Sequence, residues 1–327
     1  MRTANFKSAA IAALLSMGLL TGCTNGITNQ KTSNHMDTLN LTQEWDKKFP
    51  QSNKVNHRKV TFKNRYGITL AADLYEPKNI ESKVPAIAVS GPFGAVKEQS
   101  SGLYAQTMAE CGFLTLAFDP SYTGESGGEP RNVASPDINT EDFSAAVDFL
   151  IAHPNVDAKR IGIIGICGFG GMGLNAAAMD TRIKATVAST MYDMSRVNAN
   201  GYFDAEDSAE VRRNKREAMN AIRTRDAQNG TATPGTPGLP TSIKGDEPQF
   251  VKDYFDYYKT ERAFHARAIN SNGAWNPTMA LSFINMPLLT YIHEIDNAVL
   301  LIHGENAHSR YFSEDAFKRL KGKNKEL

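Results

Sequence analysis

A short apolar segment that ends in a glycine-rich turn most constrains how this chain folds. Residues 160–171 read RIGIIGICGFGG, so a run of β-forming residues is followed by Cys167 and then by closely spaced glycines. This pattern predicts a buried parallel strand, a sharp turn that carries a nucleophile, and a helix packed close behind it. Glycine is needed where the strand and the helix approach each other, because a Cβ atom would clash there. The segment therefore predicts an α/β fold with Cys167 at the turn.

Apolar strands and helices alternate on both sides of this turn. We expect a hairpin first, with strands at residues 57–63 and 68–75, and a short helix around Trp45 before it. The later strands are expected at residues 85–90, 113–118, 161–166, 184–190 and 298–303. Helices are expected at residues 101–111, 141–153, 172–179 and 313–320. Repeated βα units of this kind indicate a mostly parallel sheet with helices on both faces.

The alternation breaks over residues 195–285, which form an insertion. A loop of that length without secondary structure is uncommon, so we expect a helical cap, with a helix near residues 205–225. Caps of this kind shape pockets and exclude water. Tyr257 and Tyr258 are the cap aromatics most suited to reach a substrate, although they are equally explained as cap core. The core then comprises residues 55–194 and 286–327, preceded by a tether at residues 23–54.

The first 22 residues have the pattern of a bacterial export signal. Arg2 and Lys7 flank the start of an apolar run at residues 9–20, which is too short to span a bilayer stably. The run closes on Leu-Thr-Gly-Cys at residues 20–23, so Cys23 is the expected lipidation site of a lipoprotein anchored in the cell envelope. An ordinary secretory signal with an incidental cysteine is the alternative.

Charge and cysteine content exclude several classes of function. The 36 basic and 35 acidic residues leave a net charge of +1, which argues against a nucleic-acid partner. The three cysteines are Cys23, Cys111 and Cys167, too few for a disulfide framework, and Cys111 is expected to be a small buried side chain. The histidines are scattered without the spacing of metal ligands, and the glycines at 165–171 surround a cysteine. We therefore expect neither a metal nor a cofactor.

Three further motifs accompany the turn. They are SGPFG at residues 90–94 after a strand, DPSYTGESGG at residues 119–128 after the next strand, and His303-Gly304 at the end of the last strand. Together with the turn at Cys167, they resemble the α/β-hydrolase superfamily, in the form of dienelactone hydrolase-like and S15 peptidase-related bacterial hydrolases. The resemblance covers roughly residues 55–327. It implies hydrolysis of a small ester, thioester or amide through a covalent intermediate on a nucleophile.

The position of the nucleophile depends on how the turn is aligned. In the family, one residue separates the nucleophile from two glycines, whereas here Gly168 and Phe169 both precede the pair. Alignment on the strand selects Cys167, and alignment on the glycines selects Phe169, which has no nucleophilic atom. We favour Cys167, and we expect the helix dipole to lower its pKa, although an inert buried cysteine is the alternative. The resemblance then implies that the N–H groups of Gly168 and Phe93 form the oxyanion hole.

The remaining catalytic groups depart from the family pattern. The acid is expected near Ala307, where no carboxylate stands, so Glu305 is the first choice and Asp193 the runner-up. The family's base histidine follows one further strand, and the sequence ends at Leu327 where that strand would begin. His308 and His265 are the conceivable substitutes.

Two functions follow from this pattern. The first is an α/β-hydrolase whose activity is impaired by the missing base. The second is a membrane-anchored lipoprotein that binds a small molecule through a degenerate hydrolase fold without catalysis. His303 at the strand end and Asp119 in the loop are expected to be structural in both.

Overall fold

The structure is a computed structural model that describes residues 39–327. The export signal and Cys23 lie outside the described residues. Within residues 39–327, no helix has the length and apolar character that a membrane crossing requires.

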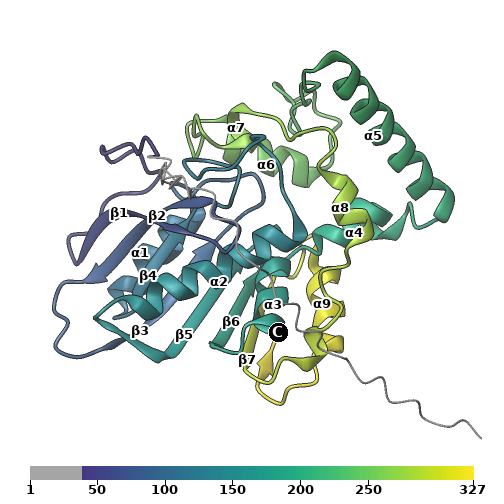
Figure 1. Ribbon diagram of the computed structural model, residues 1–327. Coiled ribbons are helices and arrows are strands. Elements are labelled where there is room, and N and C mark those ends of the chain that lie inside the picture. Colours follow the sequence, from purple (N-terminus) through teal and green to yellow (C-terminus); the bar gives the residue numbers. More distant parts are fainter. Residues whose placement is uncertain (1–38) are drawn as a thin grey trace, which may run out of the picture. The chain divides into compact units, whose positions relative to one another are not determined.

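The strands form one sheet with the order β1-β2-β4-β3-β5-β6-β7-β8 (Figure 1). β1 and β2 form the expected hairpin, and β2 also pairs antiparallel with β4. Every later pairing is parallel, as the βα alternation predicts. The strands are β1 (Val55–Lys63), β2 (Thr69–Pro77), β3 (Val84–Ser90), β4 (Leu114–Phe118), β5 (Val156–Ile166), β6 (Ile183–Ser189), β7 (Ala298–Ile302) and β8 (Lys325–Glu326).

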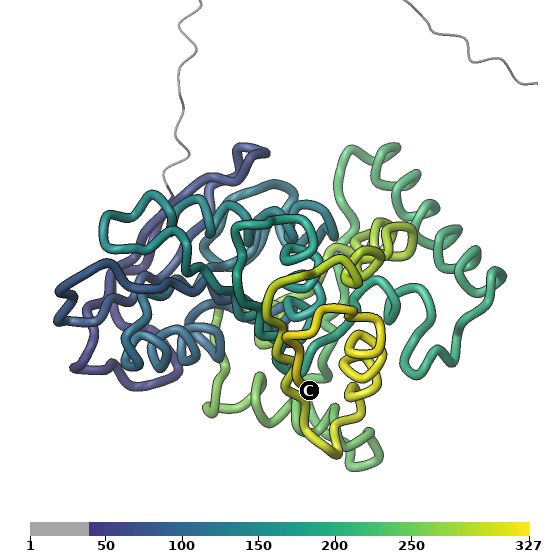
Figure 2. The backbone as a smooth tube through the Cα atoms, turned by 90° about the horizontal axis from the view of Figure 1, so that it is seen from below, coloured from purple at the N-terminus to yellow at the C-terminus, as the bar shows by residue number. Residues whose placement is uncertain are grey.

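Helices cover both faces of the sheet. Successive residues of a strand point to opposite faces, so Ala86 and Ala88 of β3 pack on one core layer and Ile87 and Val89 pack on the other. The first layer includes α2 (Pro136–Ala152), α3 (Gly168–Met179) and α9 (Arg310–Arg319), and the second includes α1 (Ser100–Glu110). Figure 2 shows the yellow C-terminal segment beside the teal strands, in agreement with the pairing of β7 with β6.

Two local expectations differ from the structure. The segment around Trp45 contains no helix, and the Trp45 indole instead donates to the Phe49 backbone oxygen at 2.9 Å. Helix α2 begins five residues before the expected start, because Ser135 caps it and a proline occupies the first turn. The apolar spacing alone did not reveal this polar first turn.

The insertion is helical. It contains α4 (Met194–Asn200), the 3₁₀ turn η1 (Tyr202–Asp204), α5 (Ala209–Asn229), α6 (Gln249–Lys259), α7 (Ile269–Asn272) and α8 (Ala280–Asn285), and the short η2 (Ile292–Glu294) leads into β7. Helix α5 extends outward, away from the sheet, in Figure 1, and only Met219 on it is buried. The shorter helices α6 and α7 bring side chains over the carboxyl ends of the strands.

A buried lysine joins the two loops at this edge of the sheet. Lys97 lies between β3 and α1, and its Nζ donates to Asp119 at 2.8 Å and to Glu125 at 2.6 Å. It also donates to the neighbouring Glu98 at 2.7 Å. Burial by itself lowers the pKa of Lys97, but the charges of the surrounding carboxylates raise it well above its ordinary value. The lysine therefore stays charged and holds the two loops together.

The same three carboxylates lie close enough together to suit a metal ion. The ammonium group of Lys97 already lies within 2.8 Å of each of them, however, and supplies the positive charge that a metal would bring. Asp119 is thus structural, as expected, and this cluster is an ion-pair network.

Replacing Lys97 tests the importance of this network. We expect Lys97→Met to lower the free energy of unfolding by about 3–5 kcal/mol, because the buried carboxylates then lose the cation that they share. Asp119 loses its ion pair, whereas Glu98 and Glu125 still pair with Lys59 and Arg267. Urea unfolding followed by circular dichroism measures this change. Lys159→Met, at an exposed position, is the matched control. A loss equal to that of the control would contradict the role of Lys97.

Candidate active site

The turn between β5 and α3 holds Cys167 in a backbone conformation that side chains rarely adopt. Its φ is 55° and its ψ is −123°, which costs on the order of 1–3 kcal/mol. The backbone fixes the turn: the Cys167 N–H donates to the Ser189 oxygen, and its carbonyl accepts from Gly170 and Tyr192, each at 2.9 Å. Hydrogen bonds from three segments thus hold one strained residue at the carboxyl end of a central strand.

Close packing behind the turn explains the glycines. A Cβ atom on Gly165 would lie 2.1 Å from the Phe169 backbone oxygen, and one on Gly91 would lie 2.2 Å from the Ile166 oxygen. Phe169 itself is 2% exposed and belongs to the core layer with Phe143, whereas Cys167 lines a cavity. The alignment on the strand therefore selects a residue that lines the cavity, whereas the alignment on the glycines selects Phe169, which is a core residue.

The two expected oxyanion donors converge on the cysteine. The backbone N–H groups of Gly168 and Phe93 both interact with the Cys167 sulfur. The Phe93 loop is held by Asn270 of α7, whose side chain donates to the Phe93 oxygen at 2.9 Å and whose N–H donates to the Gly94 oxygen at 3.0 Å. A cap residue therefore helps to position one of the two donors.

The expected low pKa of Cys167 is wrong. Burial raises its pKa to about 11, although the N–H groups of Gly168 and Phe93 act in the opposite direction. The field at the start of α3 does not compensate for the loss of water around the sulfur. Cys111 differs from its expectation as well, because this thiol, which follows the end of α1, is exposed. The Cys167 side chain is therefore a neutral thiol near pH 7.

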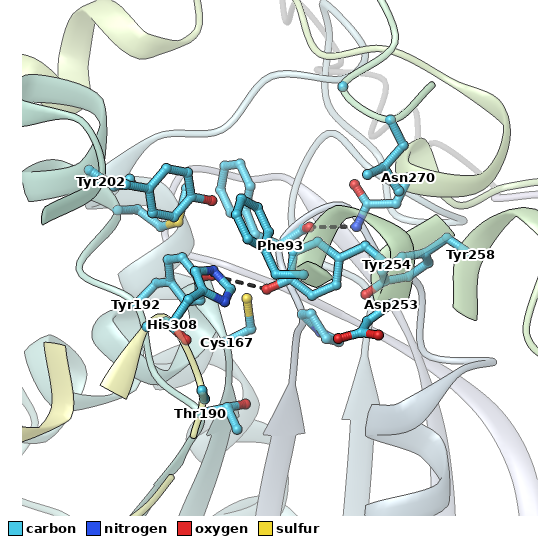
Figure 3. A pocket seen from close by; sticks show the side chains of 18 of the residues that line it. Phe93, Cys167, Thr190, Tyr192, Tyr202, Asp253, Tyr254, Tyr258, Asn270 and His308 are labelled. Atoms are coloured by element: carbon cyan, nitrogen blue, oxygen red, sulfur yellow. Dashed lines mark hydrogen bonds between the residues drawn. The ribbon is translucent and has the colours of Figure 1, made fainter. Parts of the chain in front are cut away.

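Cys167 lies in a cavity of about 680 Å³ between the core and the cap (Figure 3). Most of the lining is aromatic or aliphatic, and Phe93, Tyr254 and Trp275 are among the aromatic residues. Of the two cap tyrosines expected to reach a substrate, Tyr258 lines the cavity, whereas Tyr257 packs edge-on against Tyr258 at 4.8 Å. The cavity offers an apolar site beside the thiol.

His308 is the histidine that reaches this cavity among the described residues. Its Nε2 lies 2.6 Å from the Tyr192 hydroxyl, and its ring stacks on Phe250 of α6 at 4.0 Å. Figure 3 shows His308 and Cys167 on the same side of the cavity. Burial lowers the pKa of His308, while the charge of Asp253 raises it, and the net direction is downward. The ring is therefore neutral near pH 7 and able to accept a proton.

The other candidate histidines lie elsewhere. His265 is buried beside Asp46, with 3.6 Å between its Nε2 and the carboxylate, and does not line the cavity. His303 contacts the Ser313 hydroxyl at 2.7 Å and the Ser309 hydroxyl at 3.0 Å through its two ring nitrogens. Burial, with the nearby charges of His308 and Arg310, lowers the pKa of His303 to about 4. His303 is structural, as expected.

Neither expected acid orients a histidine. Glu305 is exposed, and its carboxylate makes no hydrogen bond to a histidine within residues 39–327. The Asp193 carboxylate caps α4 and accepts from the N–H groups of Ser195 and Arg196, each at 3.0 Å. Both choices rested on distance along the sequence from a strand end, which does not determine the direction of a side chain in an irregular loop.

The sequence analysis did not name most residues of the cavity, and Tyr192, Tyr254 and Asp253 are examples. Tyr192 lies three residues after the end of β6. Its hydroxyl contacts His308 and also lies 3.0 Å from the Tyr254 hydroxyl, so Tyr192 links these two residues. Because parallel strands end at one edge of a sheet, the position of Tyr192 was a usable signal. Asp253 and Tyr254 lie on α6 in the cap. Tyr254 begins the aromatic run at residues 254–258, which was a usable signal, whereas no motif marks Asp253.

The raised pKa of Cys167 predicts its reactivity. At pH 7.5 we expect iodoacetamide to label Cys167 more slowly than the exposed Cys111, because only the thiolate reacts and little of it forms below a pKa of about 11. Between pH 8 and 10 the Cys167 rate should rise about tenfold for each pH unit. Peptide mass spectrometry distinguishes the sites. Faster labelling of Cys167 at pH 7.5 would contradict this prediction.

The chain is similar to several known proteins. The family model for X-Pro dipeptidyl-peptidase (S15 family) matches residues 66–325. The uncharacterized protein PA2218 of Pseudomonas aeruginosa is 60% identical over 97% of this chain and 86% of its own length. The uncharacterized protein YcjY of Escherichia coli is 34% identical over 82% of this chain and 88% of its own. Thiohydrolase aneE of Aspergillus aculeatus is 33% identical, but over only 40% of this chain and 41% of its own.

Solved structures agree with these sequence matches. The crystal structure of PA2218 superposes with a TM-score of 0.85 at 64% identity, covering 88% of this chain and 89% of that chain. The α/β-hydrolase GrgF of Penicillium shares the fold, with a TM-score of 0.67 at 21% identity over 83% of this chain and 88% of that chain. The expected α/β-hydrolase fold is confirmed. By sequence and by fold, this chain belongs to the S15 peptidase family of the α/β-hydrolases.

Proposed function

We propose that this protein is a cysteine-dependent hydrolase that cleaves an ester, a thioester or a small amide through an acyl intermediate on Cys167. The observation that carries the proposal is the strained turn that holds Cys167 at the cavity, with the N–H groups of Gly168 and Phe93 directed at its sulfur. A pair of backbone donors beside a nucleophile is what an acyl-transfer transition state requires.

In the proposed reaction, the Cys167 sulfur attacks the substrate carbonyl carbon, and its proton passes to His308. The carbonyl oxygen gains the electron pair of the broken π bond and is stabilised by the two N–H groups. When the carbonyl re-forms, the bond to the leaving group breaks, and the leaving group takes the proton from His308. Water then attacks the acyl thioester, transferring a proton to His308, and the released acid leaves Cys167 protonated by the histidine.

The resting protonation states favour this order of events. A thiol with a pKa near 11 and a histidine with a lowered pKa are both neutral at pH 7. Charge separation therefore begins only when a substrate carbonyl is present to be attacked. A cysteine that is neutral at rest is also protected from solvent oxidants.

The cavity lining supports a neutral, largely apolar acyl group. Asp253 and His308 are its ionisable side chains apart from the thiol and the tyrosines, and it contains neither lysine nor arginine within the described residues. The thiohydrolase named among the relatives acts, by that name, on thio compounds. That name supports a thioester as the first substrate to assay for this chain.

Catalysis and simple binding differ in one observable. In the described chain no carboxylate hydrogen-bonds to His308, which is what favours the alternative of a binding protein with a degenerate site. Trapping of an acyl group on Cys167 separates the two, because a binding protein forms no covalent adduct.

Attachment to a membrane through Cys23 remains part of the proposal and is tested by metabolic labelling with a radioactive fatty acid.

Replacing the nucleophile tests the proposal. We expect Cys167→Ser to reduce kcat for p-nitrophenyl acetate and for an acetyl thioester by at least about a thousandfold, since the hydroxyl is a poorer nucleophile than the thiol. Cys111→Ser, an exposed position, is the matched control and should leave kcat unchanged. Intact-protein mass spectrometry should detect an added acetyl group only when Cys167 is present. Full activity in Cys167→Ser would refute the mechanism.

Replacing the base gives a second test. His308→Ala should lower kcat by about 10²–10⁴-fold, because proton transfer to a positioned group is lost. The matched control is His293→Ala, since His293 lies on η2 and does not line the cavity. The kcat of the control should equal that of the unmodified protein. If His308→Ala and His293→Ala give the same kcat, His308 is not the base.

A further inference from the structure

The turn η1 at the entrance to the cap has an unusual backbone. Phe203 has a φ of 56° and a ψ of 23°, and Asp204 has a φ of 54°. Two consecutive residues other than glycine in the left-handed region are costly, at roughly 1–3 kcal/mol each. An aspartate adopts this region more readily than most residues, but a phenylalanine does not, so contacts from outside the turn must hold Phe203.

Those contacts come from Arg196 of α4. Its guanidinium pairs with Asp204, with Nε at 2.8 Å from Oδ1 and at 3.1 Å from Oδ2. A second nitrogen donates to Asp315 of α9 at 2.9 Å, and the guanidinium lies 5.1 Å from the centre of the Tyr311 ring. The Tyr311 hydroxyl also accepts from the Phe203 N–H at 3.0 Å. Arg196 therefore ties the turn to both α4 and α9.

A planar guanidinium suits this position because it reaches two carboxylates while its face stacks on an aromatic ring. The two carboxylates raise the pKa of Arg196, chiefly through the hydrogen bonds of Asp204, against the effect of burial. The arginine is therefore charged throughout the ordinary pH range, and it holds the turn at every pH in that range.

The consequence of the turn is the position of Tyr202. The residue lines the cavity, and its ring centre lies 5.5 Å from that of His308, 5.5 Å from that of Phe250 and 6.2 Å from that of Tyr192. Figure 3 shows the Tyr202 side chain reaching across the cavity on the side of His308 and Tyr192. Tyr202 thus forms a wall beside the groups that would carry out the chemistry.

We propose that Tyr202, held in place by Arg196 through Asp204, sets the upper size limit of the acyl group that this site accepts. The inference rests on the function proposed above and goes beyond it by assigning a residue that determines specificity. Tyr202 is a wall of the cavity, and Arg196 and Asp204 are positioning residues that touch no substrate. Short acyl groups fit beside the tyrosine ring, whereas long or branched ones meet it.

The first experiment uses p-nitrophenyl esters of acetate, butyrate and octanoate. Tyr202→Ala should raise the ratio of kcat/KM for octanoate over acetate by about tenfold or more, which is the range for removing bulk from an apolar pocket. Tyr202→Leu should shift the ratio in the same direction by less, and it replaces Tyr202→Ala if that variant melts below the assay temperature. An unchanged ratio in a folded variant would overturn the assignment of Tyr202.

The second variant tests the positioning pair. Asp204→Asn preserves the side-chain shape and tolerates the left-handed conformation, but it removes the charge that Arg196 holds. We expect it to shift the ratio in the same direction as Tyr202→Ala, by about threefold, because a loosened wall excludes long chains less completely. The matched control is Glu217→Gln, which removes the same charge from the exposed pair with Arg213 on α5. If the ratio of kcat/KM for octanoate over acetate is the same in Asp204→Asn as in Glu217→Gln, the positioning role of Arg196 and Asp204 is overturned.

A third measurement is independent of catalysis. At pH 9 the labelling rates of Cys167 by iodoacetamide and by the bulkier N-benzyl iodoacetamide are compared by peptide mass spectrometry. Tyr202→Ala should raise the relative rate of the bulky reagent, and Glu217→Gln should not. If Cys167→Ser retained full hydrolysis, the proposed function would fail, while this labelling ratio would still decide the role of Tyr202. If the ratio of the two labelling rates is unchanged in Tyr202→Ala, Tyr202 does not limit access to Cys167, and the proposal is overturned.

Discussion

The buried charge of Lys97 is the interaction on which the arrangement of the site depends. Its ammonium group holds Asp119 and Glu125 of the loop after β4 against the segment that leads from β3 to α1. That segment carries Phe93, one of the two N–H donors at Cys167. Arg267 of the cap joins the same network, at 2.8 Å from Glu98 and 2.7 Å from Asp46. One buried ion cluster therefore connects the core, the cap and the segment that carries Phe93.

Burial has opposite consequences for structure and for reactivity in this chain. In the ion cluster it strengthens the attraction between Lys97 and the carboxylates, because little water screens them. At Cys167 it removes the water that would stabilise a thiolate, and the nearby N–H groups compensate only in part. In the proposed reaction, the site would therefore stabilise the charge of a transition state and not a charge at rest. Charge that develops only during attack is what a set of fixed dipoles stabilises best.

The sequence allowed the core of the fold to be predicted, but only part of the site. The βα order, the hairpin and the turn at Cys167 were predictable because strand periodicity and turn glycines are local signals. Gly168 and Phe93 were implied by the family resemblance, and the structure brings their N–H groups to the Cys167 sulfur. The two acids predicted from the sequence do not contact a histidine in the structure, since Glu305 is exposed and Asp193 caps α4. His308 carried little weight, because only the folded loop brings it against Tyr192 and Phe250.

By itself the sequence determined the class of fold, the residue at the turn and the type of chemistry that such a turn supports. These depend on short segments whose backbone geometry follows from the residues within them. The tertiary structure alone decided which histidine lines the same cavity as the thiol, how the thiol ionises and which tyrosines line the cavity. Those properties depend on side chains that lie far apart in the sequence. Tyr192 and His308 of the core are 116 residues apart, and Asn270 of the cap and Phe93 of the core are 177 residues apart. No local pattern encodes such distances, because packing between the two parts of the chain creates them.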